Sequence, residues 1–385
     1  MRKILLEILF LSLTALLAGC ASAESQEVWM YAVSAGKADA ILIGANGKAC
    51  LVDAGYGRSR GKILFAMKRM GIDRLEAVFV THTDKDHTEG LTWLAESGIE
   101  VGAWYASAMY TGVKEKNHPA VKAAEIRNQQ VIWLQAGDAV ALGSATLNVL
   151  APSRLNEDKD DNNSLVMMFS TDQGSILLAG DMEFPEEEIL LASGADLSCD
   201  MLKVGNHADD DTTSQALVRA AMPKAAVICT DSSEKPETPD VRVLALLESV
   251  GAETFVTQEC TGGILARLSG GVPSVERIDL PAQPSKVSIA SLSVDEDRIT
   301  LQNAGDQSAD LTGWYLYSDR GGELYVFPDG TALAPGAALT LGTNSTDGPT
   351  DLRWDDKKVI HRSKSDRITL YDPNGLAVSY MDNGL

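Results

Sequence analysis

The sequence predicts a layered α/β domain followed by a small all-β sandwich. Apolar runs of strand length alternate with helical stretches over residues 27–270, the pattern of a layered α/β domain and not of a helical bundle. A proline-spaced linker follows at residues 280–286. Over residues 286–385, short alternating runs are separated by Gly, Asp, Asn and Pro, and no stretch has helical periodicity. We therefore expect two domains of different architecture.

Each run in the α/β part has a predicted element. Strands are expected at 28–33, 40–44, 49–52, 77–80, 131–134, 145–150, 165–169, 175–179, 201–204, 225–229 and 264–268. Helices are expected at 59–70, 88–96, 213–221 and 240–250. The run 264–268 is predicted to be the last strand of this domain. In the sandwich, strands are expected at 299–302, 315–317, 338–341 and 368–371, with Trp314 in the core.

The composition and the net charge exclude several classes of protein. The chain has 385 residues, of which 45% are apolar and 23% charged, so a collagenous, low-complexity or wholly disordered protein is excluded. The formal net charge is −21. Such a surface repels the phosphate backbone of nucleic acids. The sequence therefore contains no evident basic nucleic-acid-binding surface.

The first twenty residues predict export. Arg2 and Lys3 precede an apolar run that is too short for a stable membrane span, and the run ends in Leu17-Ala18-Gly19-Cys20. This ending resembles a bacterial lipobox, which implies cleavage before Cys20 and lipidation of its sulfur. We expect an exported protein that is lipid-anchored to the cell membrane or envelope. The alternative is a plain secretory signal with an incidental cysteine.

The remaining cysteines are expected to be buried thiols. Cys50 and Cys229 lie inside apolar strand-like runs, and together with Cys199 and Cys260 they show no metal-ligand spacing. An exported protein could pair these four residues in three different ways, so disulfides stay an alternative.

Potential metal ligands are concentrated directly after the predicted strand 77–80. Two of the five histidines in the chain, His82 and His87, are interleaved here with Asp84 and Asp86. Imidazole and carboxylate groups are ligands for Zn, Mn or Fe, and a loop at a strand end can project them in different directions. The alternative is a charged, solvated turn after a buried strand.

Two further candidates follow later strands. Asp181 follows the strand 175–179 and His207 the strand 201–204, which places both at the rim of the sheet. Asp181 could instead cap a helix near residues 185–191, and His207 could be a surface residue. His118 is expected at the surface.

Several motifs in order resemble a known family. The sequence from His82 to His87 resembles the His-x-His-x-Asp-His signature of the metallo-β-lactamase fold, with Asp84 in place of the second histidine. The variant is similar to the hydrolase domain of the ComEC-type competence proteins. The other matching segments are Val33 to Ala40, Val52-Asp53-Ala54-Gly55, Asn162-Asn163-Ser164-Leu165-Val166, Leu178-Ala179-Gly180-Asp181 and Leu202-Lys203-Val204-Gly205-Asn206-His207. The resemblance implies an αββα sandwich and a metal-dependent hydrolase.

The resemblance also implies one or two divalent metal ions, with Zn as the first choice and Mn as the alternative. The expected ligands are His82, Asp84, Asp86, His87, Asp181 and His207. Asn206 replaces a histidine of the family pattern, and no histidine stands near Asn163, where many relatives place a ligand. Because oxygen-rich ligation shifts the preference away from Zn, we expect one tight site and one labile site.

The expected chemistry is hydrolysis by a metal-activated water. Asp86 is the candidate catalytic residue, which would orient the water or accept its proton. Lys203, Asn163 and Ser164 are candidate substrate contacts, although solvation at a strand edge is an alternative role for Lys203. The resemblance favours a phosphodiester substrate, either DNA or a phosphate ester of the envelope. An ester or amide hydrolase on the same centre stays open, as does a non-catalytic surface binding or scaffold protein with a degenerate metal site.

The last hundred residues resemble a lamin-tail domain. The matching runs are Ile299 to Asp306, Asp310 to Leu316, Leu333 to Gly336 and Ile368 to Asp372. That family has an immunoglobulin-like fold. We expect this domain to act in docking or positioning, with a possible docking partner, and not in catalysis.

Overall fold

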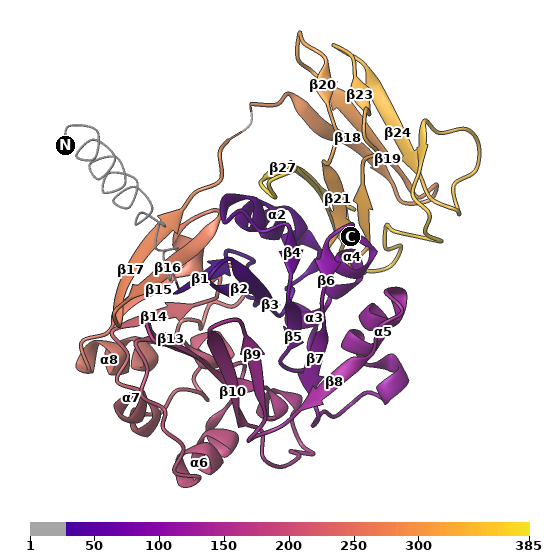
Figure 1. The fold of residues 1–385 in the computed structure, drawn as a ribbon. Coiled ribbons are helices and arrows are strands. Elements are labelled where there is room, and N and C mark those ends of the chain that lie inside the picture. Colours follow the sequence, from indigo (N-terminus) through magenta and orange to yellow (C-terminus); the bar gives the residue numbers. More distant parts are fainter. Residues whose placement is uncertain (1–27, 283) are drawn as a thin grey trace, which may run out of the picture.

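The computed structural model of the protein describes residues 28–282 and 284–385. The predicted signal segment and Cys20 lie outside the described residues. Two large β-sheets pack face to face with helices on their outer sides, and a smaller β-sandwich follows at the C-terminal end (Figure 1). This is the predicted α/β layering followed by an all-β unit.

The first sheet holds the N-terminal strands and the last two strands of the α/β part. Its order is β17-β16-β1-β2-β3-β5-β7-β8. In chain order the strands are β1 (Val28–Val33), β2 (Ile41–Ala45), β3 (Lys48–Val52), β5 (Ala77–Val80), β7 (Trp104–Ser107), β8 (Val131–Leu134), β16 (Gly263–Ser269) and β17 (Val272–Ile278). Because β3, β5, β7 and β8 run parallel, their carboxyl ends meet at one edge of the sheet.

The second sheet has the order β15-β14-β13-β12-β11-β10-β9. Its strands are β9 (Ala139–Leu142), β10 (Ala145–Ala151), β11 (Val166–Thr171), β12 (Gly174–Leu178), β13 (Met201–Lys203), β14 (Ala225–Ile228) and β15 (Glu253–Val256). The last four strands in chain order, β12 to β15, are parallel to one another. Residues that follow β12 and β13 therefore share one rim of this sheet.

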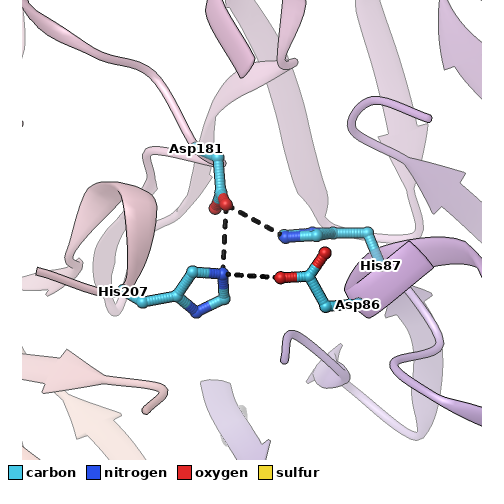
Figure 2. A group of neighbouring side chains, drawn as sticks. All are labelled: Asp86, His87, Asp181 and His207. Carbon is cyan, nitrogen blue, oxygen red and sulfur yellow. Dashed lines mark hydrogen bonds and ion pairs between the residues drawn. The ribbon is translucent and has the colours of Figure 1, made fainter. Parts of the chain in front are cut away.

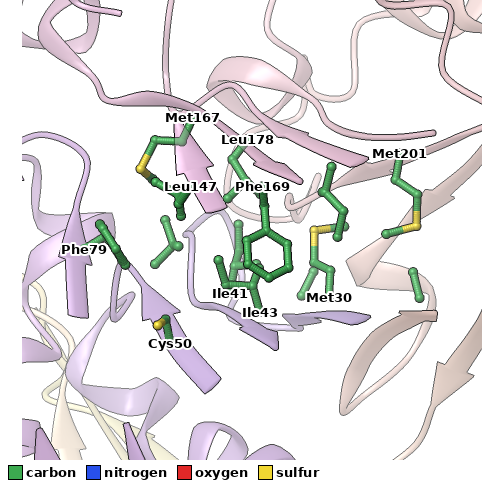
Figure 3. Packing of buried hydrophobic residues seen from close by; sticks show 14 of the residues in the cluster. Met30, Ile41, Ile43, Cys50, Phe79, Leu147, Met167, Phe169, Leu178 and Met201 are labelled. Carbon is green, nitrogen blue, oxygen red and sulfur yellow. The ribbon is translucent and has the colours of Figure 1, made fainter. Parts of the chain in front are cut away.

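The main hydrophobic core fills the space between the two sheets (Figure 3). Met30, Ile41 and Phe79 extend from the first sheet towards residues such as Leu147 and Phe169 on the second. Burial of side chains of this size stabilises the fold by about 1.5–3 kcal/mol each. The sheets alternate inward and outward residues, so each has a second apolar face that requires helices to cover it.

Helices cover these outer faces. Against the first sheet lie α2 (Arg60–Arg69), α4 (Leu91–Glu96) and α5 (Pro119–Ile126). Against the second lie α6 (Phe184–Ala192), α7 (Gln215–Ala221) and α8 (Val241–Ser249). The short helix α3 (Lys85–Thr88) lies at the sheet rim, and β4 (Arg74–Leu75) and β6 (Glu100–Val101) form a small separate sheet. The result is the four-layer αββα arrangement.

Three local expectations are wrong. The run 264–268 is not the last strand, because the turn at Gly270 and Gly271 leads into β17, which pairs with β16 along its length. The predicted helix 88–96 is divided at Gly90, where any Cβ would collide with the carbonyl oxygen of Ala54. His118 is only 1% exposed, because its ring packs against Tyr110 and Trp133 while its Nδ1 accepts a hydrogen bond from the Ala120 amide at the start of α5.

The C-terminal unit is a sandwich with its own core. Its main sheets have the orders β18-β19-β24-β25 and β22-β21-β26-β27. The strands are β18 (Val287–Ser293), β19 (Arg298–Asn303), β20 (Ala309–Asp310), β21 (Tyr315–Ser318), β22 (Leu324–Val326), β23 (Ala332–Leu333), β24 (Ala338–Gly342), β25 (Leu352–Arg353), β26 (Arg367–Tyr371) and β27 (Ala377–Asp382). Trp314 is buried in this core, as predicted.

Cys50, Cys199, Cys229 and Cys260 are buried free thiols, which is the state that the strand context favours. Within residues 28–282 and 284–385, every helix is too short or too polar to cross a bilayer.

Candidate metal centre

The candidate centre starts in the loop between β5 and α3. The four residues of β5 are buried, and the chain then turns so that His82 lies in the interior. Asp160 secures this loop: its Oδ2 accepts hydrogen bonds from the Thr83 amide at 2.9 Å and from the Thr83 hydroxyl at 2.6 Å. These bonds hold the His82 loop against the 3₁₀ turn η3 (Asp160–Asn163).

Four buried residues form what we call the inner cluster: Asp86, His87, Asp181 and His207. Asp181 Oδ2 lies 3.1 Å from His87 Nε2 and 3.0 Å from His207 Nε2, and His207 Nε2 lies 3.5 Å from Asp86 Oδ2 (Figure 2). One donor atom from each residue lies within 4.8 Å of the others. Residues from α3, the end of β12 and the turn after β13 thus meet at one point.

The remaining ring nitrogens orient both imidazoles. His87 Nδ1 lies 2.7 Å from Asp53 Oδ2, and that carboxylate also accepts the Thr81 hydroxyl at 2.7 Å. His207 Nδ1 donates to the carbonyl oxygen of Cys229 at 2.7 Å. Both Nε2 atoms therefore face the cluster, an arrangement in which outer partners hold metal-ligating histidines.

The backbone at both later ligands is specialised. His207 lies in the turn η4 (Gly205–Ala208), where it and its neighbours Asn206 and Ala208 have φ angles of 53°, 38° and 62°. Left-handed backbone at non-glycine residues is costly and is concentrated at functional sites. Asp181 follows Gly180, where a Cβ would press against the side chain of Ser164.

In the inner cluster, the positive charges of the imidazolium groups and the negative charges of the carboxylates stabilise one another. Burial would lower the pKa of His207, but the carboxylates of Asp181 and Asp86 raise it to about 9. Burial would raise the pKa of Asp181, but His207 and His87 hold it well below its usual range. Without metal, the cluster is held by imidazolium–carboxylate attraction. A metal ion would replace the protons, since neutral imidazole is the ligand form.

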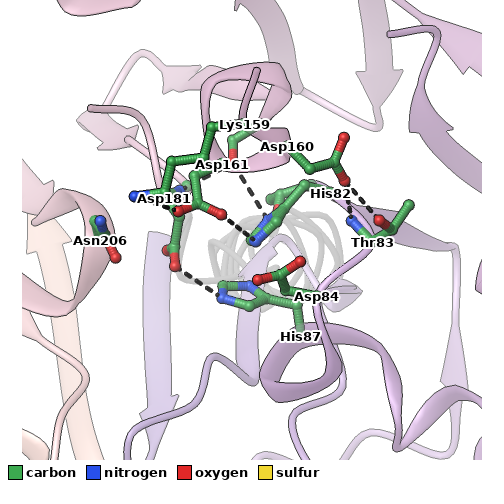
Figure 4. A network of polar contacts seen from close by, with 12 residues as sticks. His82, Thr83, Asp84, His87, Lys159, Asp160, Asp161, Asp181 and Asn206 are labelled. Atoms are coloured by element: carbon green, nitrogen blue, oxygen red, sulfur yellow. Dashed lines mark hydrogen bonds and ion pairs between the residues drawn. The ribbon is translucent and has the colours of Figure 1, made fainter. Parts of the chain in front are cut away.

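A second group, which we call the outer cluster, consists of His82, Asp84 and Asp161 (Figure 4). His82 Nε2 lies 3.8 Å from Asp161 Oδ1, and its Nδ1 lies 3.2 Å from the Ser164 hydroxyl. Burial and the nearby Asp161 raise the pKa of Asp84, although His82 opposes this. The rings of His82 and His87 are 4.2 Å apart, so the two clusters adjoin.

Asp161 is the ligand candidate that the sequence analysis missed. The sequence has no histidine near Asn163, but Asp160 and Asp161 stand just before it. The available signal was the carboxylate at position 161, directly before the matching Asn162-Asn163 motif. Asp161 places an oxygen donor beside His82, which strengthens the oxygen-rich character expected of this half.

The structure contradicts the predicted role of Lys203 as a substrate contact. The side chain is 1% exposed, and its Nζ contacts Asp39, the Gly180 carbonyl oxygen at 3.2 Å and Asp181 Oδ1 at 3.7 Å. A buried ammonium group with these partners is not open to substrate. Lys203 instead supports the carboxylates behind the inner cluster.

Asn163 and Ser164 are also buried behind the site. Asn163 donates to the carbonyl oxygen of Asn156 at 2.9 Å, and the Ser164 hydroxyl contacts His82 and accepts from the Asp181 amide at 3.1 Å. These contacts shape the loops. In this arrangement neither side chain is positioned as an open substrate contact.

Two lysines lie at the open side of the centre. Lys37 Nζ is 2.7 Å from Asp86 Oδ2, and its side chain is 23% exposed. Lys159 Nζ is 3.1 Å from Asp161 Oδ2, and its side chain is 48% exposed. Each cluster thus has a partly exposed ammonium group on one of its carboxylates.

Comparison with known proteins identifies the family. The family profile described as "Metallo-beta-lactamase superfamily" matches residues 33–232. The chain belongs to this superfamily. A second profile, "Lamin Tail Domain", matches residues 281–383. The fold class and both resemblances seen in the sequence are confirmed.

Two curated bacterial relatives match part of the chain. The chain is 25% identical over 182 residues to "ComE operon protein 3" of Bacillus subtilis, covering 46% of this chain and 23% of that protein. It is 26% identical over 210 residues to "Recombination protein 2" of Haemophilus influenzae, covering 53% and 24%. The chain therefore spans about a quarter of the length of these relatives.

The chain also has similarity to solved structures. The metallo-beta-lactamase fold protein YhfI from Bacillus subtilis has 10% identity and a TM-score of 0.43, covering 63% of this chain and 100% of that chain. CmlA, a diiron beta-hydroxylase from Streptomyces venezuelae, has 14% identity and a TM-score of 0.42, covering 66% and 54%.

Superfamily membership supports a hydrolase-type enzyme that binds divalent metal ions, and the residues present fit such ions. His82 Nε2, His207 Nε2 and Asp181 Oδ1 are buried with ion-pair contacts to neighbouring charged groups but without a hydrogen bond of good geometry. Buried polar atoms are normally paired, so atoms left open towards two ligand clusters are accounted for by a cation. The inner cluster would hold one ion through nitrogen and oxygen donors, and the outer cluster a second, mainly through oxygen.

Proposed function

We propose that the protein is an exported, lipid-anchored, metal-dependent phosphodiesterase. The observation that carries the proposal is the pair of adjoining ligand clusters, with ring centroids of His82 and His87 4.2 Å apart. When bound, two divalent ions at adjoining sites supply a Lewis acid for a phosphoryl oxygen and activate a water for attack on phosphorus.

The lysines at the open side favour an anionic substrate. Lys37 and Lys159 each hold a carboxylate that a cation would take over as ligand. Once Asp86 is engaged by a cation, the Lys37 ammonium group is available for an anionic phosphate oxygen, whereas Lys159 keeps Glu183 and Asp211 as partners. A neutral ester or amide would gain less binding energy from an ammonium group at this position. This supports a phosphodiester over the alternative ester or amide substrate.

Asp86 would orient the attacking water. Burial would raise the pKa of Asp86, but the nearby His207, His87 and Lys37 hold it well below its usual range. The carboxylate therefore stays ionised at neutral pH and accepts hydrogen bonds. Such a carboxylate can orient a water molecule by accepting a hydrogen bond from it, but it is a weak base.

The net charge limits the form of the substrate. A protein with a formal net charge of −21 repels an extended nucleic acid, whereas the two lysines attract a phosphate group locally. Short phosphodiesters or local contacts to a phosphate polymer of the envelope fit this distribution better than processive work on duplex DNA.

The direct test measures hydrolysis of bis(p-nitrophenyl) phosphate, single-stranded DNA and p-nitrophenyl acetate with Zn²⁺ or Mn²⁺. We expect metal-dependent hydrolysis of the phosphodiesters, and Asp86→Asn should lower it by about a hundredfold. Asp329→Asn, an exposed sandwich carboxylate, is the control. Hydrolysis of only the acetate would favour the ester alternative, and no hydrolysis with any metal would favour the scaffold.

Export and lipid anchoring are tested separately. Wild-type protein should sediment with the membrane fraction and incorporate a labelled fatty acid. Cys20→Ser should lose the label and leave the membrane fraction. Retention of Cys20→Ser with membranes would contradict the anchor.

A further inference from the structure

Two tyrosines of the sandwich reach into the metal-binding domain. Tyr315 and Tyr317 both lie on β21 and are fully buried. The Tyr315 hydroxyl donates to the carbonyl oxygen of Arg58 at 2.8 Å and accepts from the Gly61 amide at 3.3 Å. Tyr315 therefore satisfies backbone groups at the start of α2, a role that a local cap residue usually fills.

Tyr317 is connected to the ligand-bearing helix. Its hydroxyl donates to Glu89 Oε1, and that oxygen also accepts from the Gly57 amide at 3.3 Å. Glu89 Oε2 lies 3.3 Å from Lys85 Nζ. Lys85 and Glu89 bracket α3, and the inner-cluster residues Asp86 and His87 lie between them. The sandwich thus contacts the segment that supplies two ligands at its C-terminal end, through Glu89.

A second path runs from Tyr315 to Lys37. The Arg58 guanidinium pairs with Glu234 Oε1 at 2.6 Å and lies 4.3 Å from the centre of the Tyr56 ring. Glu234 Oε2 accepts from the backbone amide of Lys37 at 3.3 Å. Lys37 Nζ in turn contacts Asp86. Both paths therefore end at Asp86.

The contact between the domains leaves no room for larger side chains at two glycines. A Cβ on Gly61 would collide with the backbone of Gly375 in the sandwich, and a Cβ on Gly322 would collide with the Glu89 carboxylate. Both tyrosine hydroxyl groups are paired, and the backbones meet where only glycine fits. A surface built in this way is a fixed contact, in contrast to a free face that awaits a partner.

We propose that the lamin-tail sandwich is a positioning part of the metal centre. Tyr317, through Glu89, sets the orientation of α3, and Tyr315, through the Arg58 segment, sets the Lys37 turn. This inference rests on the metal-dependent function proposed above, but not on the identity of the substrate. It assigns the sandwich an internal role in place of the expected docking role.

The test compares Tyr317→Phe with Tyr380→Phe. Tyr380 belongs to the same sheet of the sandwich, but its side chain is 60% exposed and contacts Arg367. The readouts are metal retained after dialysis, the visible absorption spectrum of the Co²⁺-loaded protein, and kcat and KM for bis(p-nitrophenyl) phosphate. We expect Tyr317→Phe to weaken metal binding by about tenfold, the lower range for loss of an outer partner. The Co²⁺ spectrum should change and kcat should fall with KM retained, while Tyr380→Phe matches wild type.

Two more variants keep the test decisive. Glu89→Gln retains an oxygen that accepts from Tyr317, so it should retain more metal than Glu89→Ala. Gly61→Ala, which wedges the domains apart without altering a ligand, should reproduce Tyr317→Phe. Thermal unfolding checks that each variant is folded.

The outcomes separate the two proposals. If Tyr317→Phe and Gly61→Ala are folded and match Tyr380→Phe in metal retention and spectrum, the positioning role is overturned. If metal retention and spectrum respond as expected but no phosphodiester is cleaved, the positioning role stands and the proposed substrate class fails.

Discussion

The two ligand clusters differ in burial, donor chemistry and support. The inner cluster has two imidazoles and two carboxylates, all buried. Each of its members has a partner outside the cluster: Lys37 for Asp86, Asp53 for His87, Lys203 for Asp181 and Cys229 for His207. The outer cluster has one imidazole and two carboxylates, and Asp84 is exposed.

This difference between the clusters indicates different metal affinities and exchange rates. Nitrogen donors held by outer partners favour tight binding of Zn²⁺, whereas oxygen donors at an exposed position suit Mn²⁺ or fast exchange. The hypothesis of one tight and one labile site therefore gains a structural basis. The inner cluster would be the permanent site and the outer cluster the exchangeable one.

Removing an imidazole from each cluster gives the largest expected contrast. His207→Ala should abolish tight metal retention and lower phosphodiester hydrolysis by about a thousandfold, because a buried ligand and charge are lost. His82→Ala should leave the tight equivalent in place and be restored in part by excess Mn²⁺. Elemental analysis and kcat measure both effects, with His361→Ala in the sandwich as control. Greater loss of tight metal in His82→Ala would reverse the assignment.

Protonation of the inner cluster predicts a pH dependence. The pKa of His207 is raised from its ordinary value of 6.5 to about 9 in the folded protein. Its contribution to stability is therefore fully present below pH 6.5 and is lost as pH rises through about 9. In metal-free protein, the stability difference between wild type and His207→Gln should shrink by up to about 3 kcal/mol from pH 6 to pH 10. Urea unfolding at several pH values measures this, and a difference that grows with pH would contradict it.

What could be predicted from sequence depended on the range of the interactions. The positions of most strands along the chain and the His82 loop were visible because periodicity and motif spacing are local properties. Asp161 was not, because its place beside His82 depends on the bond between Thr83 and Asp160, which are 77 residues apart. Lys203 was misinterpreted for a similar reason, since its burial follows from the packing of the rim against Asp39.

The same limit applies to the surface of the molecule. His118 follows a run of polar residues in the sequence, but in the fold its ring packs against Tyr110 and Trp133. The strand β17 has few buried residues, so its pattern gave a weak strand signal. The contacts of Tyr315 and Tyr317 with α2 and α3 join segments from different domains, and no local pattern predicts them.

Lys37 and Lys159, the two lysines at the open side of the centre, are expected to differ in their effect on substrate binding. Lys37→Gln should lower phosphodiester hydrolysis by about tenfold, the value of one charge-assisted hydrogen bond. Lys159→Gln should have a smaller effect, since Lys159 is more exposed and lies on the outer cluster. Hydrolysis of neutral p-nitrophenyl acetate should not change, and Lys37→Arg should retain more activity than Lys37→Gln. Equal losses on both substrates would mean that Lys37 supports Asp86 only.

The smallest expected effect comes from making the outer cluster resemble the inner one. Asp84 is exposed at the N-terminal cap position of α3 and makes no side-chain capping bond there, so its replacement should leave the fold intact. Asp84→His adds an imidazole to His82 and Asp161. Zinc retained after dialysis should then rise from about one to about two equivalents, because nitrogen donors favour Zn²⁺. Asp84→Asn, which removes the charge without adding an imidazole, should show no such gain. If wild-type protein already retains both equivalents, the contrast between the clusters does not control metal exchange, and the outer cluster is as tight as the inner one.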